Sequence, residues 1–125
     1  MSPKLTESHV ERSIVDFLSL DGWICRKTEE NYSERKRKRT GESGMPDRQC
    51  VRYGIGVACE MFWLELKSRK GKTAAHQKAW HAAERARGAL VVVAHQDFEP
   101  SIEGFAAWYR QSGLQRNMSL KIGAK

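Results

Sequence analysis

The segment spanning residues 62–94 constrains the fold more than any other part of the sequence. Residues 62–67 form an aromatic and aliphatic run with charges only near its end, which is typical of a strand. The alanine-rich residues 74–87 then predict a helix, and Gly88 supplies its stop signal. The apolar residues 90–94, flanked by turn signals, predict a buried strand. A strand, a helix and a strand in this order predict a right-handed parallel crossover, and therefore an α/β fold.

The remaining elements follow from periodicity and composition. Apolar residues at every fourth position predict a helix over about residues 6–20. Residues 23–25 and 49–53 predict short strands. An amphipathic terminal helix is indicated by an i, i+3, i+4, i+7 set, formed by Ile102, Phe105, Ala106 and Tyr109. The predicted order is helix, strand, strand, strand, helix, strand, helix, which gives one central mixed β-sheet flanked by helices.

The length of 125 residues fits a single domain. We expect this domain over residues 1–113, with a basic loop at 26–44 that is mobile or loosely paired, and a loose polar tail at 114–125. No apolar run is long enough to span a membrane, and the N-terminal residues lack the apolar stretch of a signal peptide. The three cysteines have no CxxC spacing, which argues against a secreted disulfide scaffold. The expectation is a reduced, cytoplasmic protein of bacterial or phage-encoded type.

Positive charge dominates the sequence, with 22 Lys and Arg residues against 15 Asp and Glu residues and a formal net charge of +7. This excess predicts a polyanionic partner, but charge alone does not distinguish binding from cutting. The densest part is an unbroken run that is either a phosphate-tracking arm or a solvated loop: Arg35, Lys36, Arg37, Lys38 and Arg39. Other basic residues beside the predicted strand ends would extend the same surface: Arg48, Arg52, Arg69, Lys70 and Lys72.

Two carboxylates and a lysine carry the most specific chemical signal. Residues two apart in a strand point to the same side, so Glu65 and Lys67 share a face, and Asp47 at the mouth of a neighbouring strand would complete a carboxylate pair. Such a pair suits Mg²⁺, which would activate water for phosphodiester hydrolysis while a lysine stabilises charge on the phosphate. Simpler interpretations stay open, with Asp47 as a turn residue and Lys67 as a solvated strand end. Glu65 is the hardest to explain otherwise, because a carboxylate inside an apolar strand is costly unless paired or liganded.

This arrangement, Pro46-Asp47 followed by Glu65-Leu66-Lys67, resembles the PD-(D/E)xK nuclease superfamily. A glycine before the PD pair, an aromatic strand leading into ELK, then a glycine and a helix bearing Gln77 are similar to its virus-type replication-repair nuclease (VRR-NUC) branch. The resemblance extends over about residues 7–112 and implies a restriction-endonuclease-like core. It further implies a metal-dependent endonuclease acting on DNA.

The resemblance also assigns roles to individual residues. It implies Mg²⁺, with Mn²⁺ as a substitute, bound by Asp47 and Glu65 together with the backbone carbonyl of Leu66, and by Glu11 through water. The implied catalytic set is Glu11, Asp47, Glu65, Lys67 and Gln77. Stand-alone members of this branch resemble Holliday-junction resolvases, which act as homodimers. Branched DNA and a homodimer are therefore the implied substrate and assembly.

Several competing interpretations remain. Glu11 has capping-box spacing to Ser8, Glu7 competes for its catalytic role, and Gln77 has the alternative of a surface residue on an alanine-rich helix. The histidines do not predict a zinc site, since none has metal-ligand spacing: His9, His76, His81 and His95. The alternative function is a basic nucleic-acid-binding module that does not cut.

Overall fold

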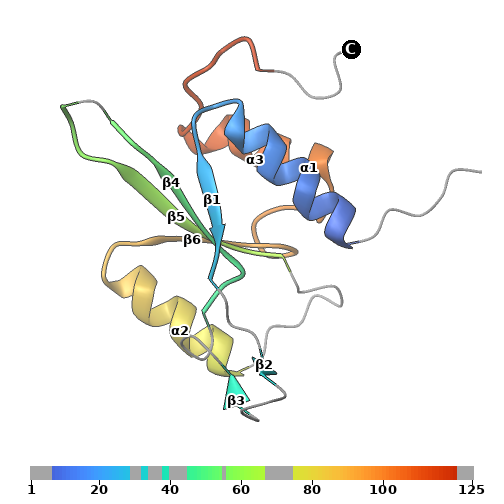
Figure 1. Cartoon of the computed structure of the whole chain (residues 1–125), viewed down its shortest axis with the longest axis vertical. Coiled ribbons are helices and arrows are strands. Elements are labelled where there is room, and N and C mark those ends of the chain that lie inside the picture. Colours follow the sequence, from blue (N-terminus) through green and yellow to red (C-terminus); the bar gives the residue numbers. More distant parts are fainter. Residues whose placement is uncertain are drawn as a thin grey trace, which may run out of the picture.

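The computed structural model describes residues 7–28, 32–33, 38–39, 45–54, 56–66 and 75–120. Within these ranges none of the helices has the length and apolar character that crossing a membrane requires. The elements follow one another in the order α1 (Glu7–Ser19), β1 (Ile24–Lys27), β2 (Tyr32–Ser33), β3 (Lys38–Arg39), β4 (Arg48–Arg52), β5 (Glu60–Glu65), α2 (Ala75–Ala86), β6 (Leu90–Val93) and α3 (Ile102–Ser112) (Figure 1).

Four strands form an open mixed sheet in the order β1-β4-β5-β6. β1 pairs with β4 and β4 with β5 in antiparallel fashion, while β5 and β6 are parallel and are joined through α2. The predicted α/β class and the parallel strand–helix–strand unit are therefore confirmed. The two-residue strands β2 and β3 pair with each other in a separate antiparallel ribbon, in line with the loosely paired form of the loop predicted at residues 26–44.

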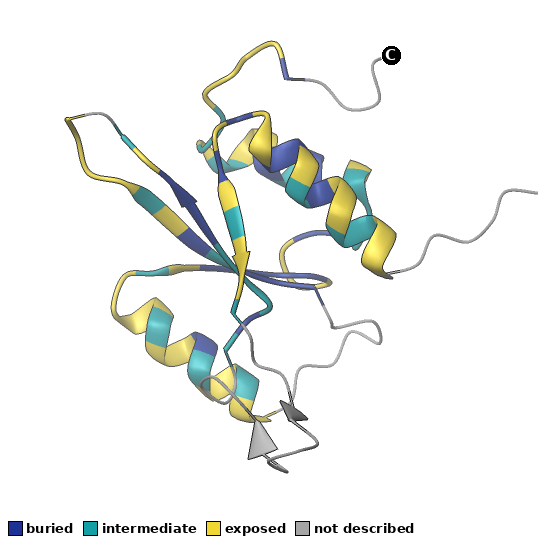
Figure 2. Ribbon diagram, in the orientation of Figure 1, coloured by how far each residue is buried: buried dark blue, intermediate teal, exposed yellow. Residues whose placement is uncertain are grey.

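The helices cover the two faces of the sheet unequally. Figure 1 shows α1 and α3 together on one face and α2 on the other. The alternation of side chains along β5 fits this arrangement, because Phe62 and Leu64 belong to the fully buried core under α1 and α3, whereas Trp63 contacts Trp80 of α2. Edge-to-face aromatic contacts join α1 to α3, with Phe17 contacting rings of α3. Figure 2 shows the buried positions concentrated between this helix pair and the sheet.

Predicted and observed boundaries agree closely for the helices and less closely for the strands. The prediction over residues 74–87 corresponds to α2, and Gly88 adopts a φ of 97°, the left-handed conformation expected after a helix end. The strand predicted at 62–67 instead spans Glu60–Glu65. It begins earlier because Glu60 pairs with Arg52 beside the loop that connects β4 to β5. Cross-strand pairing thus adds two residues that composition alone does not mark.

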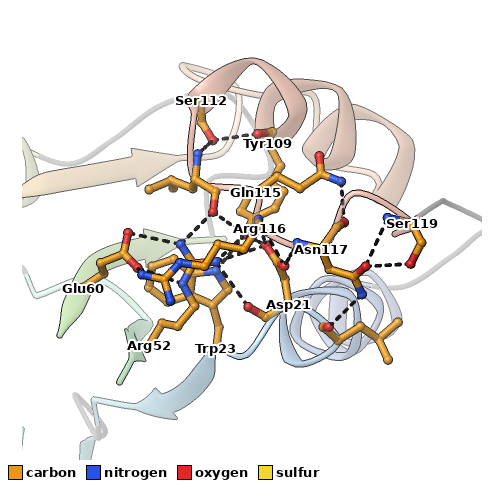
Figure 3. A network of polar contacts seen from close by, with 12 residues as sticks. Asp21, Trp23, Arg52, Glu60, Tyr109, Ser112, Gln115, Arg116, Asn117 and Ser119 are labelled. Atoms are coloured by element: carbon orange, nitrogen blue, oxygen red, sulfur yellow. Dashed lines mark hydrogen bonds and ion pairs between the residues drawn. The ribbon is translucent and has the colours of Figure 1, made fainter. Parts of the chain in front are cut away.

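The expectation of a loose tail after Gly113 is wrong for residues 114–120. The backbone N–H groups of Arg116 and Asn117 donate hydrogen bonds to the carboxylate of Asp21, at 3.0 and 2.6 Å (Figure 3). Arg52 donates to the carbonyl of Leu114 at 2.7 Å, and the side chain of Leu120 is buried. The tail is held because a buried carboxylate and a buried guanidinium offer its backbone strong polar partners.

Candidate active site

One edge of the sheet gathers the residues of the predicted carboxylate pair. Because β4 runs antiparallel to β5, the start of β4 and the end of β5 meet at the same edge. The register pairs Arg48 with Leu64, so the next position along places Asp47 opposite Glu65. Residues directly opposite each other on adjacent strands have Cβ atoms roughly 4.5–5.5 Å apart. The two predicted metal ligands therefore lie on neighbouring strands at one sheet edge.

Asp47 is held in place by both neighbouring strands. The backbone N–H of Thr28 donates to the carbonyl of Asp47 at 3.2 Å, and the Thr28 hydroxyl donates to the carbonyl of buried Pro46 at 2.6 Å. On the other side, Oδ2 of Asp47 accepts a hydrogen bond from the backbone N–H of Leu66 at 2.8 Å. The carboxylate of Asp47 is thus fixed over the residue that follows Glu65.

Glu65 is only 2% exposed, although it is a charged residue between two leucines. Its Oε2 accepts a hydrogen bond from Nε2 of Gln77 at 2.9 Å, and its backbone carbonyl accepts one from Ala94 of the neighbouring strand segment at 2.9 Å. A buried carboxylate is costly without polar partners, and like charges opposite one another on adjacent strands destabilise a sheet. A divalent cation at this edge would offset both effects, and oxygen donors of this kind suit Mg²⁺.

Helix α2 reaches Glu65 because its sheet-facing side is aromatic and polar. The rings of Trp80 and Trp63 meet edge to face with centroids 5.0 Å apart. Nε1 of Trp63 also donates to Oε2 of Glu84 at 3.2 Å, which fixes a second turn of the helix on β5. These contacts hold α2 so that Gln77 meets Glu65, and Gln77 is therefore not a free surface residue. Trp80 therefore packs on the sheet through Trp63.

Glu11 forms an ion pair with Arg48, which is not part of the predicted carboxylate pair. Its Oε2 accepts a hydrogen bond from Nε of Arg48 at 2.7 Å, and the two side chains are 24% and 15% exposed. Nη1 of Arg48 also donates to the carbonyl of Cys25 at 3.1 Å. Among the described residues, no group of three His, Cys, Asp or Glu side chains is arranged to hold a metal ion. Glu11 thus contacts β4 through Arg48, and Arg48, predicted to contact DNA, is engaged inside the fold.

Several predicted site residues fall where the structure gives no side-chain description. Lys67, the predicted catalytic lysine, lies outside the described residues. The predicted DNA-binding residues Arg35, Lys36, Arg37, Arg69, Lys70 and Lys72 also lie outside them, and Lys38 and Arg39 are described only as the backbone of β3. Arg52 is different, because it is 3% exposed and paired with Asp21 and Glu60. Its predicted place on a positive surface is therefore wrong.

A second polar cluster, around Asp21, went unpredicted (Figure 3). Burial alone would raise the pKa of Asp21, but hydrogen bonds from Tyr109, Arg116 and Asn117 and the charge of Arg52 hold that pKa below its usual value. In the sequence, Asp21 simply follows the helix predicted over about residues 6–20. The alternation of side chains along β4 could have predicted this cluster. Arg52 lies on the same inward face as Cys50, and a buried arginine needs a buried anionic partner.

Comparison of the chain with family models, curated proteins and solved structures gave no match. The most distinctive chemistry of the described residues remains the carboxylate pair at the sheet edge. Asp47 and Glu65 offer oxygen donors on rigid, hydrogen-bonded strands, with Gln77 orienting one of them. Such an arrangement can bind a hard cation and present it to a substrate at the edge of the sheet.

Proposed function

We propose that the chain is a Mg²⁺-dependent DNA endonuclease with Asp47 and Glu65 at its active site. The observation that carries the proposal is the position of the Asp47 carboxylate. It accepts the Leu66 N–H at 2.8 Å and lies opposite a glutamate that is 2% exposed. An acidic pair at a sheet edge, with a buried glutamate and a partly exposed aspartate, has a clear chemical use in a basic protein that acts on phosphodiesters, since it can hold a cation against a polyanion.

The donor set fits the implied metal. Asp47 and Glu65 would supply carboxylate oxygens and Leu66 its backbone carbonyl, which are all hard donors of the kind that Mg²⁺ and Mn²⁺ accept. Two carboxylates are enough for Mg²⁺, because this ion usually keeps several of its own waters. When bound, the cation would polarise a phosphoryl oxygen and lower the pKa of a bound water.

The residues of the chain have separate tasks in this proposal. Gln77 orients the Glu65 carboxylate, and Thr28 fixes the backbone that carries Asp47. Lys67, two residues beyond Glu65, would stabilise the charge that develops on the phosphate, an assignment that rests on the sequence motif. Glu11 was expected to reach the metal through water. Its ion pair with Arg48 supports a positioning role instead, because Arg48 directly follows Asp47 in the chain.

Substrate and assembly are proposed from charge and from the resemblance to the VRR-NUC branch. The net charge of +7 and the basic run at residues 35–39 favour a nucleic acid, and the resemblance favours branched DNA such as a four-way junction. Apart from the β2–β3 ribbon, the elements follow the order helix, strand, strand, strand, helix, strand, helix, which supports the proposed restriction-endonuclease-like core. The Pro-Asp pair of the motif occurs once in the sequence, so paired cuts in a junction would need a homodimer.

The test is a cleavage panel with labelled junction, flap, nicked, single-stranded and plain duplex DNA, in Mg²⁺, in Mn²⁺ and in EDTA. Wild-type protein should cleave at least one branched substrate with either metal and none in EDTA. Glu65→Gln should lower the cleavage rate by about 100-fold or more, since several kcal/mol of transition-state stabilisation depend on the metal. Gln77→Ala should lower it by about tenfold, as expected for a residue that orients a ligand.

Glu99→Gln is the matched control, because it removes one exposed carboxylate and changes the net charge by the same amount as Glu65→Gln. It should cleave as wild type does. Equal rates for wild type and Glu65→Gln would refute the assignment. Salt-sensitive DNA binding without a metal-dependent product in any arm would identify a binding module instead.

A further inference from the structure

Two cysteine side chains face each other across the β1–β4 pair. The register places Cys25 directly opposite Cys50 on the adjacent strand. Cys50 is fully buried in the core under α1 and α3, and Cys25 packs against the same core while remaining partly exposed. The thiols therefore share one face of the sheet and lie side by side.

The hydrogen-bonding pattern brings these two residues especially close. The backbone N–H of Thr28 donates to the carbonyl of Asp47, which makes Thr28 and Asp47 a hydrogen-bonded pair. Pairs alternate along an antiparallel ladder, so the Cys25–Cys50 pair, three positions away, is a non-hydrogen-bonded one. Such pairs have Cα atoms about 4.5 Å apart, closer than their neighbours. This separation falls within the range that a disulfide bond spans, about 4.4–6.8 Å between Cα atoms.

The two thiols differ in reactivity as well as in exposure. Hydrogen bonding with the Cys50 thiol lowers the pKa of Cys25 against the opposing effect of burial, and the nearby charge of Arg48 lowers it further. The same hydrogen bond and burial raise the pKa of Cys50, which therefore stays protonated. Thiolate character together with access governs oxidation, so Cys25 is the thiol that reacts first.

We propose that Cys25 and Cys50 form a redox-active pair that a peroxide converts into a disulfide bond between β1 and β4. The Cys25 thiolate attacks one peroxide oxygen, the O–O bond breaks, and the products are a sulfenic acid on Cys25 and hydroxide. The Cys50 sulfur then attacks the Cys25 sulfur and the S–O bond breaks. The Cys50 proton leaves with the departing oxygen as water. Two thiol sulfurs are oxidised in total, and one peroxide is reduced to hydroxide and water.

This modification site is independent of the proposed nuclease function. Its side chains lie on the α1 and α3 face of the sheet, whereas Glu65 meets Gln77 of α2 on the opposite face. A cysteine pair in a reduced compartment would be a reversible sensor rather than a permanent staple, since disulfides there are transient. Failure of DNA cleavage would therefore leave this proposal untouched.

The test uses full-length protein carrying Cys59→Ser, which removes an exposed thiol in the β4–β5 loop. Reduced protein is treated with hydrogen peroxide, and free thiols in denaturant, intact mass and proteolytic peptides are measured. Both remaining thiols should disappear together, with a mass loss of about 2 Da, a joined peptide pair and no dimer. Dithiothreitol should restore both thiols.

Two further variants separate the roles of the cysteines. With Cys50→Ser added, Cys25 should instead gain oxygen atoms, because it has no resolving partner. With Cys25→Ser added, Cys50 should keep its thiol under the same treatment. The proposal is overturned if the Cys59→Ser protein keeps both thiols, or if Cys25 gains oxygen while Cys50 stays free.

Discussion

Replacing Asp21 with asparagine probes the polar cluster that closes the fold around the C-terminal residues. The carboxylate of Asp21 accepts hydrogen bonds from Tyr109, from Arg52 at 3.1 Å and from the backbone N–H groups of Arg116 and Asn117 (Figure 3). Its side chain is 1% exposed. Asparagine preserves the shape, but it removes the charge and turns an N–H₂ group toward donors that need an acceptor.

The magnitude follows from what remains after the substitution. Breaking a buried ion pair usually costs about 3–5 kcal/mol. Arg52 keeps both oxygens of Glu60 and the carbonyl of Leu114, so we expect the lower end of this range, about 3 kcal/mol. Unfolding entropy is about 2.1 cal/mol/K per residue, or about 0.26 kcal/mol/K for 125 residues, so Tm should fall by about 11 °C.

The loss in free energy of unfolding caused by Asp21→Asn should depend on pH in a defined direction. The folded pKa of Asp21 is lowered, so its carboxylate contributes stability that is fully present above the unfolded pKa of about 3.9. That contribution is lost as the pH falls through the lower folded pKa. The gap in stability between wild type and Asp21→Asn should therefore be constant near neutrality and should narrow below about pH 4.

The assay is urea unfolding followed by circular dichroism across this pH range, with Asp16→Asn as the control. Asp16 lies near the end of α1, shortly before Asp21, is exposed, and loses the same charge on substitution. The control should change the free energy of unfolding by less than about 0.5 kcal/mol. The reasoning fails if Asp21→Asn unfolds at the same urea concentration as Asp16→Asn, or if its penalty grows as the pH falls.

Two further substitutions test the Arg48 ion pair and the buried histidine of α2. Glu11→Gln should lower the free energy of unfolding by about 1 kcal/mol, because a partly exposed ion pair with Arg48 is lost. The same variant should bind Mn²⁺ with unchanged affinity. Loss of Mn²⁺ binding in calorimetry would instead make Glu11 a ligand. His81 is 1% exposed, and its Nε2 has no hydrogen-bond partner among the described residues. Burial lowers the pKa of His81, and Arg85 lowers it further against the opposing effect of Asp97. The unfolded chain therefore takes up a proton at His81 more readily than the folded chain does. Wild type should lose stability relative to His81→Leu as the pH falls below about 6.5. The measurement is the Tm of both proteins as a function of pH. An equal fall in Tm for wild type and His81→Leu would contradict this prediction.

Much of the fold was predictable because its elements have strong local signals. The fourfold apolar spacing in α1, the glycine after α2 and the aromatic run in β5 each appear within a short window of sequence. The sheet edge that joins Asp47 and Glu65 followed from strand alternation and the motif. The docking of residues 114–120 could not be predicted in this way, since it depends on a contact between Asp21 and a backbone 95 residues away.

The candidate site was predictable in its residue types and less so in its contacts. Gln77 and Glu65 meet because Trp80 packs on Trp63 and fixes the rotation of α2, which no local pattern specifies. Arg48 and Arg52 looked like surface cations because composition does not reveal burial. Both occupy inward positions of β4, where a charged side chain must find a carboxylate. Tertiary pairing therefore decided which basic residues remained available for a polyanion.

Titration of the metal-free protein with Mn²⁺ in a calorimeter tests the central claim most directly. Asp47→Asn keeps an oxygen that can accept the Leu66 N–H, and Glu65→Gln keeps one for Gln77, so both variants remove charge with little change in shape. Wild type and Glu99→Gln should bind Mn²⁺ saturably, and each site variant should lose at least about tenfold in affinity. Equal Mn²⁺ affinity in wild type, Asp47→Asn and Glu65→Gln would show that the carboxylate pair is not a metal site.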